Sequence, residues 1–347
     1  MKLGILKSFK EIDNRIEYYI KSCQELNIDF VVLNLLSENW LEEIKKSKVD
    51  GILVRIKGDI QEQKSMYDER LHIINSELGI PIYPSRKELL LYENKRMCNY
   101  WMQINHIQHT PTSIFYTKAD AIKFINKATF PLVFKTNCGA ASSGVRIIRS
   151  KLQAKFILHK IFGIIDPRLS MGNTLWGYKK GILFPRFGNN QKHYVFIQPY
   201  IPHKWEWRVS KIGDSFFGLK KRKKGNFASG SGMPLWVEPP RELFELTKHI
   251  CEVGQFDSMA VDILEAENGD FYVNELQSLF GSTSPFQLRV NNKPGRYKYI
   301  NNNWIFEEGE YNRFGSCLLR VEDFVMKLNN KYYNNKKDIN QIDKTFS

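Results

Sequence analysis

The chain has 347 residues, 42% of them hydrophobic, and a formal net charge of +14. This length and apolar content can bury more than one hydrophobic core, which excludes a wholly disordered chain. The five cysteines are scattered without metal-site spacing, and no apolar run approaches the roughly 20 residues of a membrane helix. We therefore expect a reduced, cytoplasmic protein without a membrane span.

Residues 1–85 alternate strand and helix patterns. The expected strands are Leu3–Leu6, Phe30–Leu35, Gly51–Ile56 and Pro81–Pro84, and the expected helices are Ile12–Leu26, Glu38–Lys46 and Gln61–Leu78. This β-α-β-α order predicts a small parallel α/β unit. A helix over Leu89–Gln108 is expected to link it to the rest of the chain.

A lysine and a loop of small residues follow. The apolar run Pro131–Phe134 leads into Lys135, the loop spans residues 139–144, and a second apolar strand comes next. Small residues let backbone N–H groups approach an anion closely, and a lysine adds a point charge for phosphate. The alternative is an ordinary hairpin with a flexible tip. Residues 163–193 show no period and are expected to be a substrate-facing insertion or disordered.

Three further segments follow along the chain. The strand ending at Ile197 runs into a proline, after which backbone groups are free of ladder bonding. Beyond it Lys204, Glu206 and Arg208 share one strand face, with tryptophans on the other. The basic run Lys220–Lys224 then leads into a Gly-Ser loop, which suits phosphates or, alternatively, nucleic acid.

The last motif is an acidic hairpin. Period-two alternation puts Asp262, Glu275 and Gln277 on one face, and two carboxylates with an amide oxygen suit Mg²⁺. The alternative is a solvated acidic face. Val321–Leu328 is expected to form a closing helix.

Taken in order, these motifs resemble the ATP-grasp superfamily over roughly residues 90–285, and most closely the branch of glutathione synthetase, ribosomal-protein glutamate ligase and related proteins of polysaccharide biosynthesis. The resemblance implies an α/β fold with α+β subdomains. Its expected division is a pre-ATP-grasp parallel domain at 1–90, a linking helix and lid at 91–194, a large subdomain with the Mg-ATP site at 195–328, and a flexible tail at 329–347.

The resemblance also implies roles for individual residues. ATP phosphates would be held by Lys95, Lys135 and the loop residues Gly139, Ser142, Ser143 and Gly144. Adenine and ribose would be held by Gln198, Pro199, Tyr200, Ile201, Lys204 and Glu206. Catalysis would fall to Arg208 and Arg222, with Lys220 as an alternative to Arg222, and Mg²⁺ or Mn²⁺ would be held by Asp262, Glu275 and Gln277.

Several positions depart from the family pattern. Gln277 stands where an asparagine is usual, Glu206 replaces an aspartate, and Pro199 replaces a frequent glutamate. Ala228 occupies a position that is commonly arginine, which affects the acceptor side more than the nucleotide side.

The expected function is an ATP-dependent carboxylate–amine ligase that works through an acylphosphate, with a sugar acid or amino acid as substrate. A kinase acting on a small-molecule hydroxyl is the alternative on the same scaffold, and a basic nucleic-acid-binding protein is a third. Partners would be ATP and small carboxylates and amines, with a homodimer left open.

Overall fold

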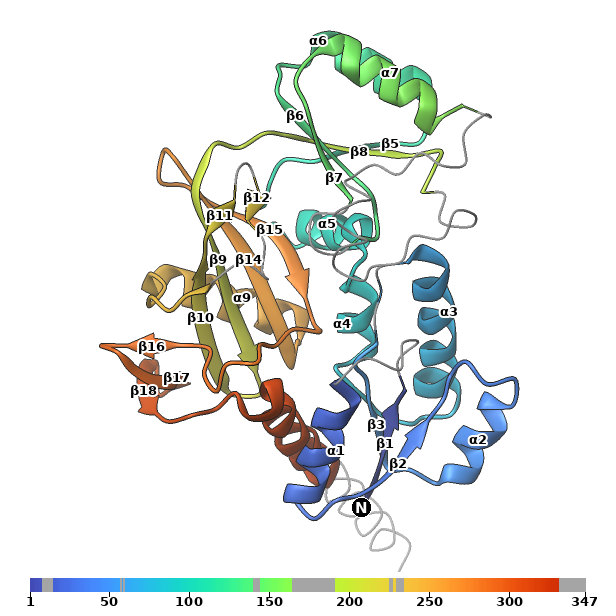
Figure 1. Cartoon of the computed structure of the whole chain (residues 1–347), viewed down its shortest axis with the longest axis vertical. Coiled ribbons are helices and arrows are strands. Elements are labelled where there is room, and N and C mark those ends of the chain that lie inside the picture. The colour runs from blue at the N-terminus through green and yellow to red at the C-terminus, as the bar shows by residue number, and fades with distance from the viewer. Residues whose placement is uncertain are drawn as a thin grey trace, which may run out of the picture.

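In the part of the chain that the computed structural model describes, the strands form three main sheets and one short ribbon (Figure 1). The structure describes residues 1–7, 15–56, 58, 60–139, 144–163, 191–224, 227–228 and 234–330. The predicted Ser142, Ser143, most of segment 163–193 and most of the tail lie outside these residues. Within them, no helix is both long and apolar enough to cross a bilayer.

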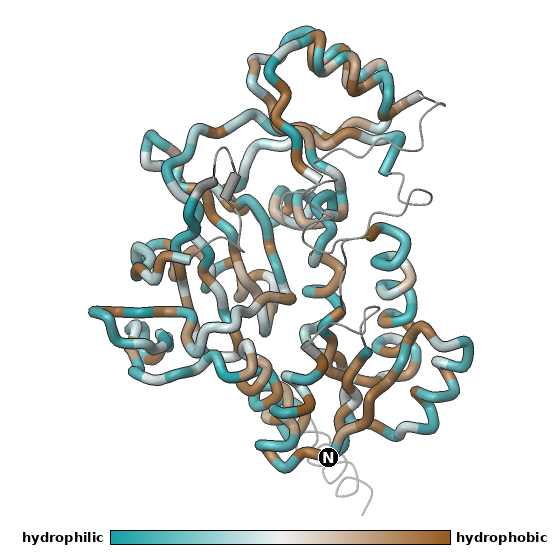
Figure 2. Tube along the Cα trace, in the orientation of Figure 1, coloured by the Kyte–Doolittle hydropathy of each residue, from teal (hydrophilic) through white to brown (hydrophobic). Residues whose placement is uncertain are grey.

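The N-terminal unit is the parallel α/β unit that the sequence predicts. Its sheet has the order β2-β1-β3-β4, with every pair parallel. The strands are β1 (Lys2–Leu6), β2 (Asp29–Leu33), β3 (Gly51–Leu53) and β4 (Ile82–Tyr83), and the helices are α1 (Arg15–Glu25), α2 (Trp40–Ser47) and α3 (Gln61–His72), which continues as a π-turn over Ile73–Glu77. Figure 2 shows hydrophobic residues along these strands and hydrophilic ones on the outer helices.

The expected helix over Leu89–Gln108 is wrong, because the chain breaks there into α4 (Arg86–Leu91) and α5 (Lys95–Ile104). Glu93 adopts a left-handed conformation with φ 49°, and the Asn94 side chain caps the new helix by accepting from the Met97 N–H at 3.3 Å. The break creates a helix N-terminus that places Lys95 beside Gly139.

The lid unit has an antiparallel sheet of order β5-β8-β6-β7, with α6 and α7 packed on one side (Figure 1). Its elements are β5 (Ser113–Phe115), α6 (Lys118–Lys127), β6 (Leu132–Lys135), β7 (Val145–Ile148), α7 (Lys151–Ile161) and β8 (Val195–Pro199). Because β8 pairs with both β5 and β6, a boundary at residue 194 would cut this sheet. We propose that the lid extends through Pro199.

The large sheet has the order β15-β14-β9-β10-β17-β16, with β13 joined to β10 and β18 to β17. Its strands are β9 (His203–Ile212), β10 (Ser215–Lys221), β13 (Pro234–Leu235), β14 (Ser258–Ala266), β15 (Phe271–Gln277), β16 (Arg289–Val290), β17 (Lys293–Ile300) and β18 (Asn303–Glu308), and the ribbon is β11 (Lys223–Lys224) with β12 (Phe227–Ala228). Helix α9 (Arg241–Gly254) packs against β9 and β14.

The end of the described chain returns to the N-terminal unit. A 3-10 turn (Arg313–Ser316) leads into a helix over 317–330, which includes the predicted closing helix. Val321 and Phe324 of this helix share a hydrophobic core with Leu3 and Tyr19. The large sheet is therefore anchored to the first unit at its lower end in Figure 1.

A buried carboxylate joins α4 to the start of β14. Glu88 is 0% exposed. Its Oε1 accepts from the backbone N–H groups of Asp257 and Ser258 at 2.9 and 2.6 Å, and its Oε2 accepts from that of Ser85 at 2.7 Å. Burial raises the pKa of Glu88 to about 7, against the opposing effect of these donors.

We expect Glu88→Ala to lower the free energy of unfolding by about 2–4 kcal/mol, because it leaves three N–H donors unpaired. Urea denaturation measures the change, and exposed Arg86→Ala on the same helix is the control.

The raised pKa of Glu88 means that the folded state holds the proton of this carboxyl group more tightly than the unfolded state does. Wild-type stability should therefore fall relative to Glu88→Gln as the pH rises from 4.5 to about 7. A parallel pH dependence in both proteins would contradict this assignment.

Candidate functional site

One face of the large sheet carries a row of charged side chains. Arg208 of β9 pairs in register with Asp262 of β14, which pairs in turn with Glu275 of β15. Side chains of residues paired in this way lie on the same face of a sheet. Helix α9 packs on the opposite face, where Phe244 Cζ lies 3.5 Å from the Cβ position of Gly218. The charged row therefore faces away from α9.

Four charged side chains on this face, those of Arg208, Asp262, Lys221 and Glu206, form an interlocked network. The Arg208 Nε and Nη2 atoms donate to the two carboxylate oxygens of Asp262, each at 2.7 Å. Lys221 Nζ lies 2.6 Å from Asp262 Oδ2 and also pairs with Glu206. The side chains of Lys221 and Asp262 are only 4% and 5% exposed, so these ion pairs are shielded from water.

The network sets the protonation of its members. Burial alone would raise the pKa of Asp262, but Arg208 and Lys221 hold it down at about 2. Burial likewise would lower the pKa of Arg208, yet Asp262 raises it above its ordinary value. For Glu206, burial wins over the nearby Lys221 and raises the pKa. Asp262 is thus a fixed negative charge at neutral pH.

The basic run contributes a residue that the sequence interpretation missed. Lys221 pairs with Glu206 in register, whereas Lys220 lies on the opposite face, with its Nζ 3.9 Å from the Trp205 ring centre and 4.8 Å from that of Trp207. Arg222 is exposed just beyond β10. A sequence signal for Lys221 did exist. If β9 and β10 are taken as a hairpin, Lys221 falls opposite Glu206 and therefore on the same face of the sheet.

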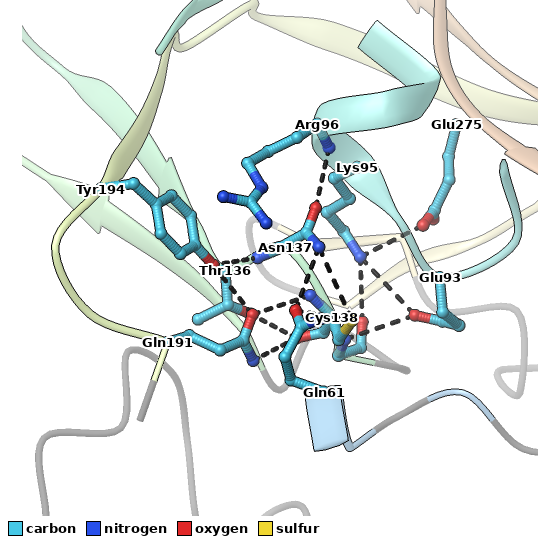
Figure 3. Close-up of polar contacts among 11 residues, drawn as sticks. Gln61, Glu93, Lys95, Arg96, Thr136, Asn137, Cys138, Gln191, Tyr194 and Glu275 are labelled. Carbon is cyan, nitrogen blue, oxygen red and sulfur yellow. Dashed lines mark hydrogen bonds and ion pairs between the residues drawn. The ribbon is translucent and has the colours of Figure 1, made fainter. Parts of the chain in front are cut away.

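Lys95 connects three parts of the site (Figure 3). Its Nζ lies 3.2 Å from Glu275 Oε1 and 3.7 Å from Glu93 Oε2, and it donates to the backbone carbonyl of Gly139 at 3.1 Å. Burial would lower the pKa of this lysine, but Glu275 and Glu93 raise it above its ordinary value. Lys95 is therefore a permanent cation between β15 and the loop that begins at Gly139.

Asn137 is the centre of a second network in Figure 3. Its Oδ1 accepts from the Arg96 N–H at 2.9 Å, its Nδ2 donates to Gln61 Oε1 at 3.1 Å, and its N–H donates to the Tyr194 hydroxyl at 2.7 Å. The Asn137 carbonyl accepts from the Lys95 N–H at 3.1 Å. This residue, which is 1% exposed, joins the end of β6 to the starts of α3 and α5.

The neighbouring Cys138 is held by Gln191, whose Oε1 also accepts from the Tyr194 hydroxyl at 2.9 Å. Its N–H donates to Gln191 Oε1 and its carbonyl accepts from Gln191 Nε2, each at 2.8 Å. Burial raises the pKa of its thiol to about 12, so Cys138 is a packing residue here. The network fixes the backbone just before Gly139.

Lys135 reaches from the lid to the large sheet. Its Nζ donates to Asn274 Oδ1 at 2.9 Å. Asn274 is the extra residue of a bulge in β15, where the pairing with β14 shifts between Glu275 and Val273. Burial, reinforced by Lys95 and opposed by Glu275, lowers the pKa of Lys135 to about 8. The bulge thus directs the Asn274 amide oxygen toward the Lys135 ammonium group, which loses its proton more readily than an ordinary lysine does.

The predicted loop begins and ends with glycines, Gly139 and Gly144, at positions where a side chain would be strained or would clash. Gly139 has φ 151°, and a Cβ on Gly144 would lie 1.9 Å from Thr136 Oγ1. The Thr136 N–H donates to the Gly144 carbonyl at 2.8 Å, which closes the base of the loop. Side chains at either position would disturb this closure.

The segment predicted to bind adenine, residues 198–201, begins where β8 stops pairing with β5. Pairing with β5 ends at Ile197, while pairing with β6 continues to Pro199. Gln198 is buried and its Nε2 donates to Thr112 Oγ1 at 2.8 Å. Backbone groups on the former β5 side are thus free of strand pairing from Gln198 onward, although β8 itself continues to Pro199, two residues beyond the predicted strand end at Ile197.

Other predicted nucleotide residues surround this segment. Tyr200 donates its N–H to the Pro131 carbonyl at 3.1 Å, and the Ile201 carbonyl lies 2.8 Å from His203 Nδ1. Lys204 is exposed at the start of β9. The structure therefore places these residues at the junction of the two sheets, and their roles stay predictions.

The predicted metal ligands lie together on the charged face. Gln277 pairs with Ala260, two residues from the Asp262–Glu275 pair, and its side chain bonds to none of the described residues. Two carboxylates and an amide oxygen are hard donors that fit Mg²⁺. In this structure Asp262 and Glu275 pair with cationic side chains, and the described ranges hold no cluster of three His, Cys, Asp or Glu residues arranged for a metal.

No family model and no curated protein matches the sequence. Solved structures do match. D-alanine–D-alanine ligase from Bacillus anthracis has 16% identity and a TM-score of 0.57, covering 95% of this chain and 99% of that one. The RimK domain ATP-grasp protein of Sphaerobacter thermophilus has 14% identity and a TM-score of 0.54, covering 80% and 91%. D-cycloserine synthetase has 10% identity and a TM-score of 0.59, covering 94% and 100%.

These similarities define the fold. The chain has the ATP-grasp fold, with a parallel N-terminal α/β unit and two antiparallel sheets, which confirms the fold that the ordered motifs predict.

Proposed function

We propose that the chain is an ATP-dependent carboxylate–amine ligase that binds Mg-ATP between the lid sheet and the large sheet. The observation that carries this proposal is the convergence of two lysines from different units on one strand. Lys95 contacts Glu275 and Lys135 contacts its neighbour Asn274, both in β15. Structures of the same fold include D-alanine–D-alanine ligase in complex with ATP and a biotin carboxylase domain with MgADP.

The charged face suits phosphoryl transfer. Lys95 and Lys135 would hold ATP phosphates, and the freed backbone from Gln198 onward would bind adenine. Mg²⁺, held by Asp262, Glu275 and Gln277, would neutralise phosphate charge. Arg208, oriented by its bidentate bond to Asp262, presents a positioned guanidinium beside these ligands.

The proposed chemistry needs little acid–base catalysis. A substrate carboxylate attacks the γ-phosphorus of ATP, forming an acylphosphate and releasing ADP. An amine then attacks the acyl carbon, the amide bond forms, and phosphate leaves while a proton passes to solvent. Positioning and charge neutralisation carry such a reaction. The placement of two of the basic-run lysines supports this over nucleic-acid binding, because Lys220 covers tryptophan rings and Lys221 is buried in ion pairs.

The test is a screen of carboxylates and amines, added singly and in pairs, that measures phosphate release from ATP. We expect release that requires Mg²⁺ and both substrates, with an amide product in mass spectra. A phosphorylated product formed without any amine would indicate the kinase instead and would overturn the proposal.

A further inference from the structure

A cationic aromatic cluster lies on the charged face of the large sheet, apart from the proposed nucleotide residues. Strand β13 pairs with β10, with Pro234 opposite Lys221 and Leu235 opposite Lys220. Arg289 of β16 pairs with Pro294 of β17, and this register puts it on the same face as Lys221. Strand β13 leads directly into Trp236. Its ring centre lies 4.9 Å from that of Phe286, at 71°.

The guanidinium of Arg289 completes this cluster. Its Cζ lies 4.2 Å from the Phe286 ring centre, and its Nε is buried without a hydrogen-bond partner. In the described part of the chain no carboxylate pairs with it, in contrast to Arg208 and Arg296, which each bind an acidic side chain. A stacked guanidinium with unused donors is suited to bind an anion.

The segment that carries Phe286 is held firmly. Asn312 Nδ2 donates to the Ser282 carbonyl at 3.1 Å and to its hydroxyl at 3.0 Å, and Asn312 Oδ1 accepts from Gln287 Nε2 at 2.9 Å. Gln287 is 4% exposed and Leu288 is fully buried. The cluster is therefore preorganised on both sides of Phe286.

The sheet gives the distance of this cluster from the reacting centre. Arg208 of β9 lies beside Leu219 of β10, and β13 is the next strand along. Two strand spacings put β13 about 10 Å from β9, and Arg289 lies on β16, which follows β10 and β17 in the order of the sheet. A group bound at Arg289 is therefore too distant to be the carboxylate that reacts beside Arg208.

We propose that Trp236, Phe286 and Arg289 bind a second, distal anionic group on one of the two substrates. The substrate is then an elongated molecule with a carboxylate or phosphate at the end away from its reacting group. Arg289 binds the anion and the two aromatic rings cover the adjoining apolar part. This inference rests on the proposed ligase function and names a substrate class for the same site.

Two pairs of probes that differ in a terminal anion test the proposal. Triglycine is compared with triglycinamide, and 6-phosphogluconate with gluconate. Binding to protein saturated with Mg²⁺ and a non-hydrolysable ATP analogue is measured by calorimetry. In at least one pair we expect the anionic member to bind at least tenfold more tightly, and the favoured pair tells a carboxylate from a phosphate.

Variants assign the effect to Arg289. Arg289→Gln should abolish the discrimination and Arg289→Lys should restore part of it, with nucleotide affinity unchanged. Arg241→Gln is the matched control, because Arg241 also stacks on an aromatic ring, that of Tyr297, at 4.9 Å, but is exposed. Wild-type protein that binds the nucleotide but discriminates in neither pair would overturn this inference alone. Absence of nucleotide binding would overturn the proposed function.

Discussion

Asp262→Asn is expected to abolish substrate-dependent ATP turnover and to destabilise the chain by about 2–4 kcal/mol. The substitution removes a proposed metal ligand and also the anion that orients Arg208. It leaves Arg208 and Lys221 in a shielded site with one counter-ion, Glu206, instead of two. Steady-state phosphate release and urea denaturation measure the two effects.

A compensating change separates these effects. Adding Lys221→Met removes the excess positive charge, so the double variant should regain stability to within about 1 kcal/mol of wild type but remain inactive. Glu265→Gln is the control, since Glu265 accepts from Trp207 Nε1 at 2.8 Å and glutamine can do the same. Near-normal turnover in Asp262→Asn would remove Asp262 from the site.

Lys135→Ala is expected to weaken ATP binding by about 1–3 kcal/mol, the range for charge-assisted hydrogen bonds. The lysine is 8% exposed, and within the described residues its side chain bonds to Asn274 alone, so phosphate oxygens can replace this neutral partner. Isothermal titration calorimetry measures the change. Equal affinity in the two proteins would reject Lys135 as a phosphate ligand.

The lowered pKa of Lys135 adds a pH dependence. Burial holds this pKa at about 8 in the ligand-free chain, and phosphate charge favours the ammonium form. Binding should therefore take up a proton above pH 8, and affinity should fall as the pH rises. Calorimetry in two buffers with different ionisation enthalpies reports the uptake. Lys135→Ala should lose it, whereas the exposed Lys204→Ala should keep it.

The sequence could predict those parts of the site that depend on alternation within a single strand. Glu206 and Arg208 share a face because they are two residues apart, and Asp262 meets Glu275 because a short turn joins β14 to β15. The parallel order of the first unit follows equally from alternating helix and strand patterns. These features are local, so a period is enough to find them.

Features that depend on tertiary contacts were missed. In the basic run, Lys220, Lys221 and Arg222 are chemically similar, and alternation selects Lys221 only once the register of β10 against β9 is known. The break before Lys95 depends on the left-handed Glu93, whose carboxylate lies beside Lys95 and near the Gly139 N–H. Helical periodicity runs through this break because tertiary bonds, rather than local propensity, interrupt the helix.

The Asn137 network has a consequence for the order of folding. Its partners Arg96, Tyr194 and Gln61 are separated from Asn137 by 41, 57 and 76 residues along the chain. Contacts so distant in sequence carry a large loop-closure cost and form late. The network forms only when the N-terminal unit, helix α5 and the chain just before strand β8 are in place together. We therefore expect the part of the proposed nucleotide site around Lys95 and Gly139 to assemble last. If the proposed function is correct, a nascent chain gains affinity for ATP only once all three parts have docked.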